Sequence, residues 1–156
     1  MAPQVAVCGP RACTDAEAQQ ARRVGELLAE RGAVVLCGGG TGVMAAVAAG
    51  ARSRGGLVVG IRPNDSRQDA SPDLSATVVT NMGEARNAII VWSADAVISV
   101  GGSWGTLSEV ALAMRRGGIP VVALGGWRIA RADGEAVPGI RYVDTPQLAV
   151  AEALGG

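Results

Sequence analysis

Short apolar runs rich in Val and Ile alternate along the chain with longer stretches in which apolar and polar residues mix. The short runs predict strands at Val5–Cys8, Val34–Cys37, Leu57–Ile61, Ala76–Val79, Ala96–Val100 and Val121–Leu124. The longer stretches predict helices over residues 15–31, 42–54, 82–94, 106–116 and 146–154. Strands that alternate with helices favour a sheet covered on both faces. We therefore predict a single α/β domain over residues 1–156, a modified Rossmann fold with a doubly wound, mostly parallel sheet and the first strand at its centre.

The ends of the predicted helices carry matching signals. Three helices end in an arginine followed by a glycine, at Arg31-Gly32, Arg54-Gly55 and Arg116-Gly117. Thr14 with Glu17, and Thr106 with Glu109, have the spacing of a capping box. The polar stretch Pro63–Ser75 is predicted to be a surface loop, long enough to close over a ligand.

Composition and charge narrow the classes of partner. The formal net charge is zero, whereas nucleic-acid and membrane-surface binders need an excess of cations. No apolar run reaches the roughly 18 residues of a membrane span, and the first residues include no basic segment. Cys8, Cys13 and Cys37 lack the spacing of a metal or redox site. These features predict a cytoplasmic protein without a metal site that binds neither nucleic acid nor membranes.

Two residue types are missing, and their absence excludes several kinds of chemistry. The chain has no His and no Lys, so all 14 cations are Arg. Without Lys there is no Schiff base to pyridoxal phosphate and no P-loop signature. Without His there is no Ser-His-Asp triad and no imidazole acid or base. Any reaction must use carboxylates, Arg, Cys, hydroxyls or backbone amides.

Two glycine-rich segments each follow a predicted strand and open a predicted helix. They are Gly38-Gly39-Gly40-Thr41-Gly42 and Gly101-Gly102-Ser103-Trp104-Gly105-Thr106. Glycines at such a junction let the backbone approach an anion, and the helix N-terminus attracts negative charge. The alternative is that both are only tight turns. A dinucleotide fingerprint fits poorly, because Val43 stands where its last glycine is required and Arg62 follows the next strand instead of an acidic residue.

The same segments are similar to a known family when read together with Met82-Gly83-Glu84-Ala85-Arg86-Asn87 and the following Leu107-Ser108-Glu109. The pattern resembles the LOG-like Rossmann proteins over about the first 125 residues. These include the LONELY GUY phosphoribohydrolases, the molybdenum cofactor carrier proteins and chains once labelled "possible lysine decarboxylase". The resemblance is strongest to the short bacterial branch that includes the cofactor carrier. Pyridoxal-dependent decarboxylation is excluded by the missing Lys.

The resemblance implies a set of site residues. Arg86 and Glu109 correspond to the catalytic pair of the phosphoribohydrolases, which cleave the N-glycosidic bond of a nucleoside 5′-monophosphate. Such a reaction suits a carboxylate beside an oxocarbenium-like transition state and an arginine that binds the anion. The residues expected to bind the nucleotide or its phosphate are Gly38, Gly39, Gly40, Thr41, Gly42, Met82, Gly102, Ser103, Trp104, Gly105 and Thr106.

Four positions depart from the hydrolase pattern: Gly101 for Pro, Ser103 for Gly, Asn87 for Lys and Ser108 for Glu. They weaken the case for hydrolysis more than the case for binding. Two functions therefore stay open, a phosphoribohydrolase that requires no cofactor and a non-catalytic carrier of a molybdopterin-type cofactor. Single-stranded DNA binding is a third, disfavoured because the chain has no net charge, no Phe and one Tyr.

Ordinary structural roles compete with several of these assignments. For Glu109 the alternative role is that of a helix cap alone. It lies opposite an expected packing stripe of Leu107, Val110, Ala111 and Met114. Arg86 lies beside a second expected stripe, formed by Met82, Ala85, Ile89 and Trp92. Trp104 either stacks on a base or wedges its loop. The segment 88–92 is apolar on every side, which predicts a homodimer that packs through this helix.

Overall fold

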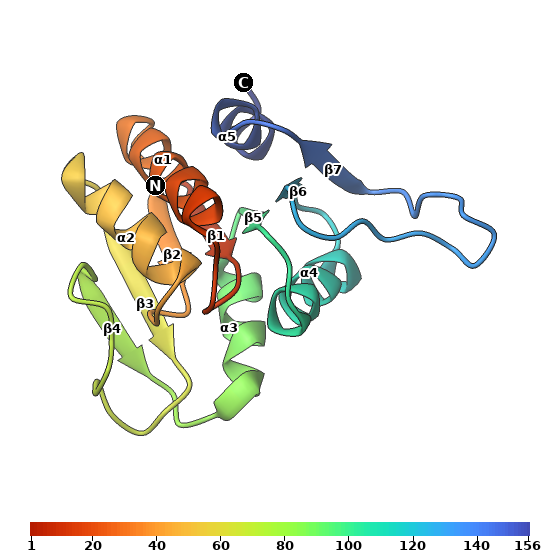
Figure 1. Ribbon diagram of the computed structural model, residues 1–156. Helices are drawn as coiled ribbons and strands as arrows, with labels where there is room; N and C mark the ends of the chain where they lie inside the picture. The colour runs from red at the N-terminus through yellow and green to blue at the C-terminus, as the bar shows by residue number, and fades with distance from the viewer.

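The computed structural model describes residues 1–156 and contains one seven-stranded sheet in the order β4-β3-β2-β1-β5-β6-β7. Every neighbouring pair of strands is parallel. The strands are β1 (Gln4–Cys8), β2 (Val34–Cys37), β3 (Val58–Arg62), β4 (Ala76–Val79), β5 (Ala96–Val100), β6 (Val121–Leu124) and β7 (Ile140–Val143). The fold class is confirmed, and β1 is the central strand, as predicted (Figure 1).

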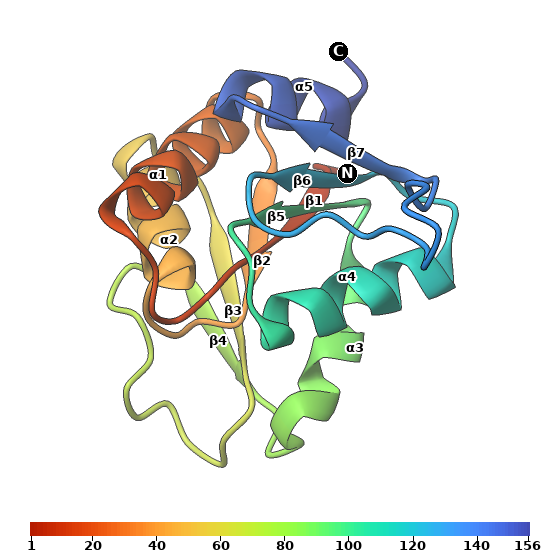
Figure 2. The same ribbon diagram turned by 45° about the vertical axis from the view of Figure 1, so that its right-hand side comes forward.

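Five α-helices cover the two faces of the sheet (Figures 1 and 2). They are α1 (Asp15–Glu30), α2 (Val43–Ser53), α3 (Arg86–Ser93), α4 (Trp104–Arg116) and α5 (Pro146–Leu154). Helices α1, α2 and α5 pack on one face over the larger apolar cluster, and α3 and α4 pack on the other face over the smaller one. No helix is both long enough and apolar enough to cross a bilayer.

The parallel arrangement brings three strand ends together at one edge. Strand β1 lies between β2 and β5, and the loops that follow these three strands leave from the same carboxyl edge of the sheet (Figure 2). Both glycine-rich segments are among these loops. In open α/β sheets, ligands bind at such an edge, where the order of strands reverses on either side of the first strand. The fold therefore places the two glycine loops at the same edge of the sheet, after the strands on either side of β1.

Helix α4 begins two residues earlier than predicted, because Ser103 caps it. The Ser103 Oγ accepts a hydrogen bond from the Thr106 amide at 3.1 Å. The predicted capping box between Thr106 and Glu109 is therefore wrong, since Thr106 already lies in the first turn and Glu109 in the second. The capping box of α1 is confirmed in both of its hydrogen bonds, between Thr14 and Glu17.

The predicted helix over residues 82–94 is divided into two elements, and it buries a different face from the predicted one. A 3-10 turn, η1 (Gly83–Ala85), precedes α3, whose buried residues are Arg86, Asn87, Ile90 and Val91. The expected stripe is wrong at both ends, since Met82 is 50% exposed and Trp92 is 65% exposed. Apolar residues surround this helix, so their spacing does not single out one face. On α4 the buried alanine is Ala113 rather than Ala111, for a similar reason.

Strand β7 was not predicted. It is short and its middle residues, Arg141 and Tyr142, interrupt the apolar pattern, yet it pairs with β6 along its whole length. The excursion over residues 125–139 that connects the two strands extends away from the sheet (Figure 1). Its two sides touch in an isolated antiparallel bridge between Ala130 and Ala136.

Candidate ligand-binding cleft

Two adjoining hollows open at the carboxyl edge of the sheet. The first, here the α4 cleft, has a volume of about 610 Å³ and is lined by the loop after β1, the turn before α3 and the start of α4. The second, here the Arg62 hollow, has a volume of about 630 Å³ and lies beside the loop after β2. The two share Arg11, Pro63 and Gly83 as a common wall. Both have the size of small-molecule sites.

The start of α4 presents unpaired donors to the first hollow. The amides of Trp104 and Gly105 make no hydrogen bond within the chain, and the Ser103 hydroxyl lies 2.9 Å from the Thr106 hydroxyl. Gly102, Ser103, Gly105 and Thr106 all line the α4 cleft. Free amides, hydroxyls and the positive end of the helix dipole together make an anion site.

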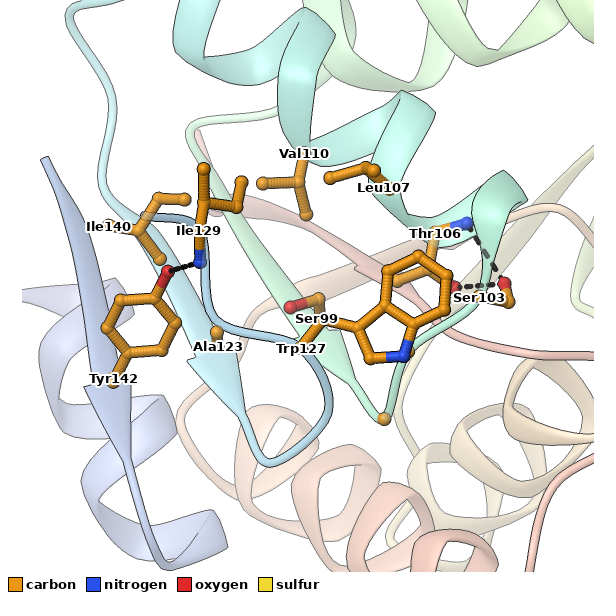
Figure 3. A pocket seen from close by; sticks show the side chains of 12 residues that line it. Ser99, Ser103, Thr106, Leu107, Val110, Ala123, Trp127, Ile129, Ile140 and Tyr142 are labelled. Carbon is orange, nitrogen blue, oxygen red and sulfur yellow. Dashed lines mark hydrogen bonds between the residues drawn. The ribbon is translucent and has the colours of Figure 1, made fainter. Parts of the chain in front are cut away.

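Aromatic side chains pack against the second glycine loop, which precedes α4 (Figure 3). The indole of Trp127 lies against Gly102, where a Cβ would come within 2.7 Å of the ring. Trp104 meets Trp127 edge to face, with 4.9 Å between ring centroids, and is 78% exposed. The Tyr142 hydroxyl accepts a hydrogen bond from the Ile129 amide at 3.0 Å. The apolar pocket among these side chains, about 30 Å³, is too small for an organic ligand.

The first glycine loop has a shape that only glycine permits at its end. Gly42 has φ +67° and ψ −129°, and a Cβ there would overlap the carbonyls of Pro10 and Arg11. The Val43 amide donates to the Pro10 carbonyl at 3.1 Å, which joins this loop to the loop after β1. Gly40 and Thr41 line the Arg62 hollow, not the α4 cleft. The two glycine loops therefore face different hollows.

Arg86 is buried and fixed to the main chain. Its Nη1 donates to the Gly38 carbonyl at 2.9 Å and to the Ile61 carbonyl at 2.6 Å, and the side chain is 7% exposed. These bonds connect the ends of β2 and β3. Burial lowers the pKa of the guanidinium, and the nearby Glu109 carboxylate raises it. Arg86 thus positions the first glycine loop and adds positive charge to the wall of the α4 cleft.

Glu109 has an unusual carboxyl group for its position on the cleft wall. Burial raises its pKa from 4.5 to about 7, although Arg86 and the Cys8 thiol act in the opposite direction. Arg86 and Glu109 form no ion pair within 4.0 Å. Near neutral pH both protonation states of Glu109 are populated, as a general acid or base requires.

Two neutral residues stand beside Glu109. Asn87 donates from Nδ2 to the Ser108 hydroxyl at 3.2 Å, and the Ser108 hydroxyl donates to the Gly105 carbonyl at 2.7 Å. The Oδ1 of Asn87 is buried without a partner, although Asn87 lines the cleft. A buried acceptor of this kind favours a ligand that brings a donor. These are two of the positions at which the sequence departs from the hydrolase pattern.

The residues named from the sequence are distributed unevenly over the site. Six of them line the α4 cleft and two line the Arg62 hollow; those that line neither are Gly38, Gly39, Gly42, Met82 and Trp104. The three glycines shape the first loop instead, and Trp104 lies against Trp127. Sequence reasoning did not single out Arg62, Asn64, Asp65, Asp69 and Asn81, which line the Arg62 hollow. Arg62 could have been found, because it is the last residue of β3 at the carboxyl edge.

Comparison with known proteins identifies the family. The model of the SLOG cluster4 family matches residues 2–150. The chain belongs to the SLOG cluster4 family. An uncharacterized protein of Archaeoglobus fulgidus is 46% identical over 140 residues, which cover 86% of this chain and 91% of the relative.

Solved structures resemble this SLOG cluster4 protein over nearly its whole length. The molybdenum cofactor binding protein of Rippkaea orientalis has a TM-score of 0.85 and 33% identity, with 94% of this chain and 92% of that chain covered. The molybdenum cofactor carrier protein of Chlamydomonas reinhardtii has a TM-score of 0.82 and 27% identity, with 100% of both chains covered. The predicted resemblance to LOG-like Rossmann proteins is confirmed.

Proposed function

We propose that this protein binds a phosphate-bearing pterin of the molybdopterin type in the α4 cleft and carries it without chemical change. The names of the two similar structures support this proposal, since one is a binding protein and the other a carrier of the molybdenum cofactor. The lining of the cleft supports it as well. Apart from Ala12, Met44 and two prolines, that lining is polar, charged or glycine, which suits a strongly hydrated ligand.

The observation on which the proposal depends most is the free anion site at the start of α4. The unpaired amide of Gly105 and the hydroxyl of Ser103, which both line the cleft, would receive a phosphate there. The unpartnered Oδ1 of Asn87 is an acceptor for an N–H group of the pterin ring. Phosphate and ring would then both be held in the α4 cleft, by groups that Ser108 connects through its hydrogen bonds to Asn87 and Gly105.

The environment of Arg86 favours carriage over hydrolysis. Its Nη1 is engaged by two main-chain carbonyls, so this nitrogen is occupied in holding the first glycine loop. Glu109 has the neutral side chains of Asn87 and Ser108 as neighbours on the cleft wall. The cleft therefore retains groups that bind a ligand. It has fewer charged groups than the hydrolase pattern, in which Lys and Glu stand at the positions of Asn87 and Ser108, to act on an oxocarbenium-like transition state.

Gly105 provides a sharp test of the phosphate site. Its Cβ position is open, with the nearest atom, the Ser103 Oγ, 3.9 Å away. We expect Gly105→Asp to weaken binding of molybdopterin by roughly 30-fold or more, because a carboxylate would face the phosphate, and Gly105→Asn to weaken it much less. Titration calorimetry of both variants, with dephosphorylated pterin as a second ligand, measures this. Equal affinities for the Asp and Asn variants would contradict a phosphate at this position.

Hydrolysis of a nucleoside 5′-monophosphate is the second candidate function. The observation in its favour is the Glu109 carboxyl, whose pKa is raised to about 7 by burial at the wall of the α4 cleft. Arg86 lies close enough to influence that pKa. In this alternative Glu109 activates water or stabilises the sugar cation, and free base would be released from AMP.

We also propose that the protein is a homodimer that packs through α3. Trp92 is 65% exposed on this helix, where Arg116 lies 5.1 Å from the centre of its ring. Exposed aromatic side chains of this size are typical of interfaces. We expect Trp92→Glu to convert the dimer to a monomer without loss of helix content. Light scattering at micromolar concentration measures the mass, and a wild-type mass of one chain would contradict the proposal.

A further inference from the structure

The lining of the Arg62 hollow suits an anion better than a flat aromatic ring. Apart from Pro63, its lining residues are polar, charged or glycine. A flat heterocycle would find little apolar surface for stacking there. The first glycine loop contributes Gly40 and Thr41 to the wall.

Arg62 is the residue that most needs a partner. It is 8% exposed, its Nε is buried without a partner, and its Nη1 makes only a long contact of 3.4 Å to the Gly38 carbonyl. No carboxylate lies within 4.0 Å of its guanidinium. Buried charges are normally paired, because removal from water is costly. A phosphate in the hollow would provide the missing acceptors and charge.

The other charges around the hollow are exposed. Arg11 stands on the wall that the two hollows share, while Asp65 and Asp69 lie in the loop after β3. The two carboxylates oppose the binding of an anion, but water screens exposed charges more than it screens the buried Arg62. Attraction therefore comes mainly from Arg62, and the acidic pair weakens it.

We infer that the Arg62 hollow binds a second phosphate group, so that the ligand carries two such groups, one at each glycine loop. This inference rests on the proposed function, which places the first phosphate at the start of α4. The class of ligand is therefore a diphosphate or a pterin joined to a nucleotide. Arg11 stands on the shared wall and contacts both parts of such a ligand.

Inorganic phosphate is the probe that tests the two sites separately. Titration followed by phosphorus NMR is expected to show two bound phosphates per wild-type chain, one in Arg62→Met and one in Gly105→Asp. The Gly105→Asn control retains both. Asp69→Asn is expected to tighten the second phosphate several-fold, because it removes an opposing charge. A second phosphate that persists in Arg62→Met would overturn the inference.

The thermal stability of the free protein separates a binding role from a structural one. If Arg62 serves a ligand, Arg62→Met should leave Tm unchanged or raise it, because an unpartnered buried guanidinium is removed. A fall in Tm of several degrees with an unchanged phosphate count would show that Arg62 only props the first loop. If wild type binds one phosphate that is lost in Arg62→Met but kept in Gly105→Asp, the phosphate site of the proposed function is wrong. If the one phosphate is lost in Gly105→Asp but kept in Arg62→Met, this inference is wrong.

Discussion

Gly42→Ala is expected to destabilise the protein by roughly 3 kcal/mol or more and to distort the first glycine loop. The backbone of Gly42 has φ +67° and ψ −129°, a region that side chains disfavour. The added Cβ would also overlap the carbonyls of Pro10 and Arg11, which are parts of the backbone that cannot turn aside. Urea denaturation of wild type and variant measures the difference.

Gly55→Ala is the matched control for this substitution. Gly55 has φ +71°, close to that of Gly42, but a Cβ there would meet nothing within 4 Å. Its replacement should therefore cost only the backbone strain, about 1 kcal/mol. Equal losses of stability in the two variants would show that overlap with the Pro10 and Arg11 carbonyls adds nothing to the cost of Gly42→Ala.

Raising the pH from 5 to 8 is expected to cost wild type up to about 3 kcal/mol of stability relative to Glu109→Gln. The carboxyl pKa is 4.5 in the unfolded chain and about 7 in the fold, because burial disfavours the charged form. The fold therefore holds the proton more tightly. Its contribution is fully present below pH 4.5, declines as the pH rises, and is lost above pH 7.

Glutamine mimics the protonated acid, so the variant should lack this decline. Chemical denaturation at pH 5, 6, 7 and 8 gives the stability of each protein, and the difference between the two removes the effect of all other titrating groups. The variant should match wild type at pH 5 and exceed it at pH 8. A difference that stays constant over this range would show that Glu109 is ionised in the fold and well solvated.

Much of the architecture could be predicted, because apolar runs in the sequence mark the buried strands and the ends of these strands locate the loops. The apolar runs of β1, β2 and β5 are buried strands, and their order places two glycine loops at the edge where α/β proteins bind ligands. The family resemblance followed from the residues of those loops. Both conclusions use local sequence, which determines where a strand ends and what begins there.

The details of the site depend on interactions that local sequence does not contain. Arg86 lies on a helix that is apolar on several sides, so its burial against the Gly38 and Ile61 carbonyls appears only in the fold. Ser103 displaces Thr106 as the cap because α4 begins at Trp104, which puts Thr106 inside the first turn. Gly40 and Thr41 of the first loop line the Arg62 hollow, whereas Gly102 and Gly105 of the second line the α4 cleft, and local sequence does not show this division.

The most direct test of carriage without chemistry is a product analysis. The protein is incubated with the molybdenum cofactor and, in parallel, with AMP, and the small molecules are identified by mass spectrometry after separation from the chain. We expect the cofactor to be bound and recovered intact, and no adenine to appear from AMP above the level without protein. Release of adenine by wild type that disappears in Glu109→Gln would contradict this account and establish the hydrolase instead.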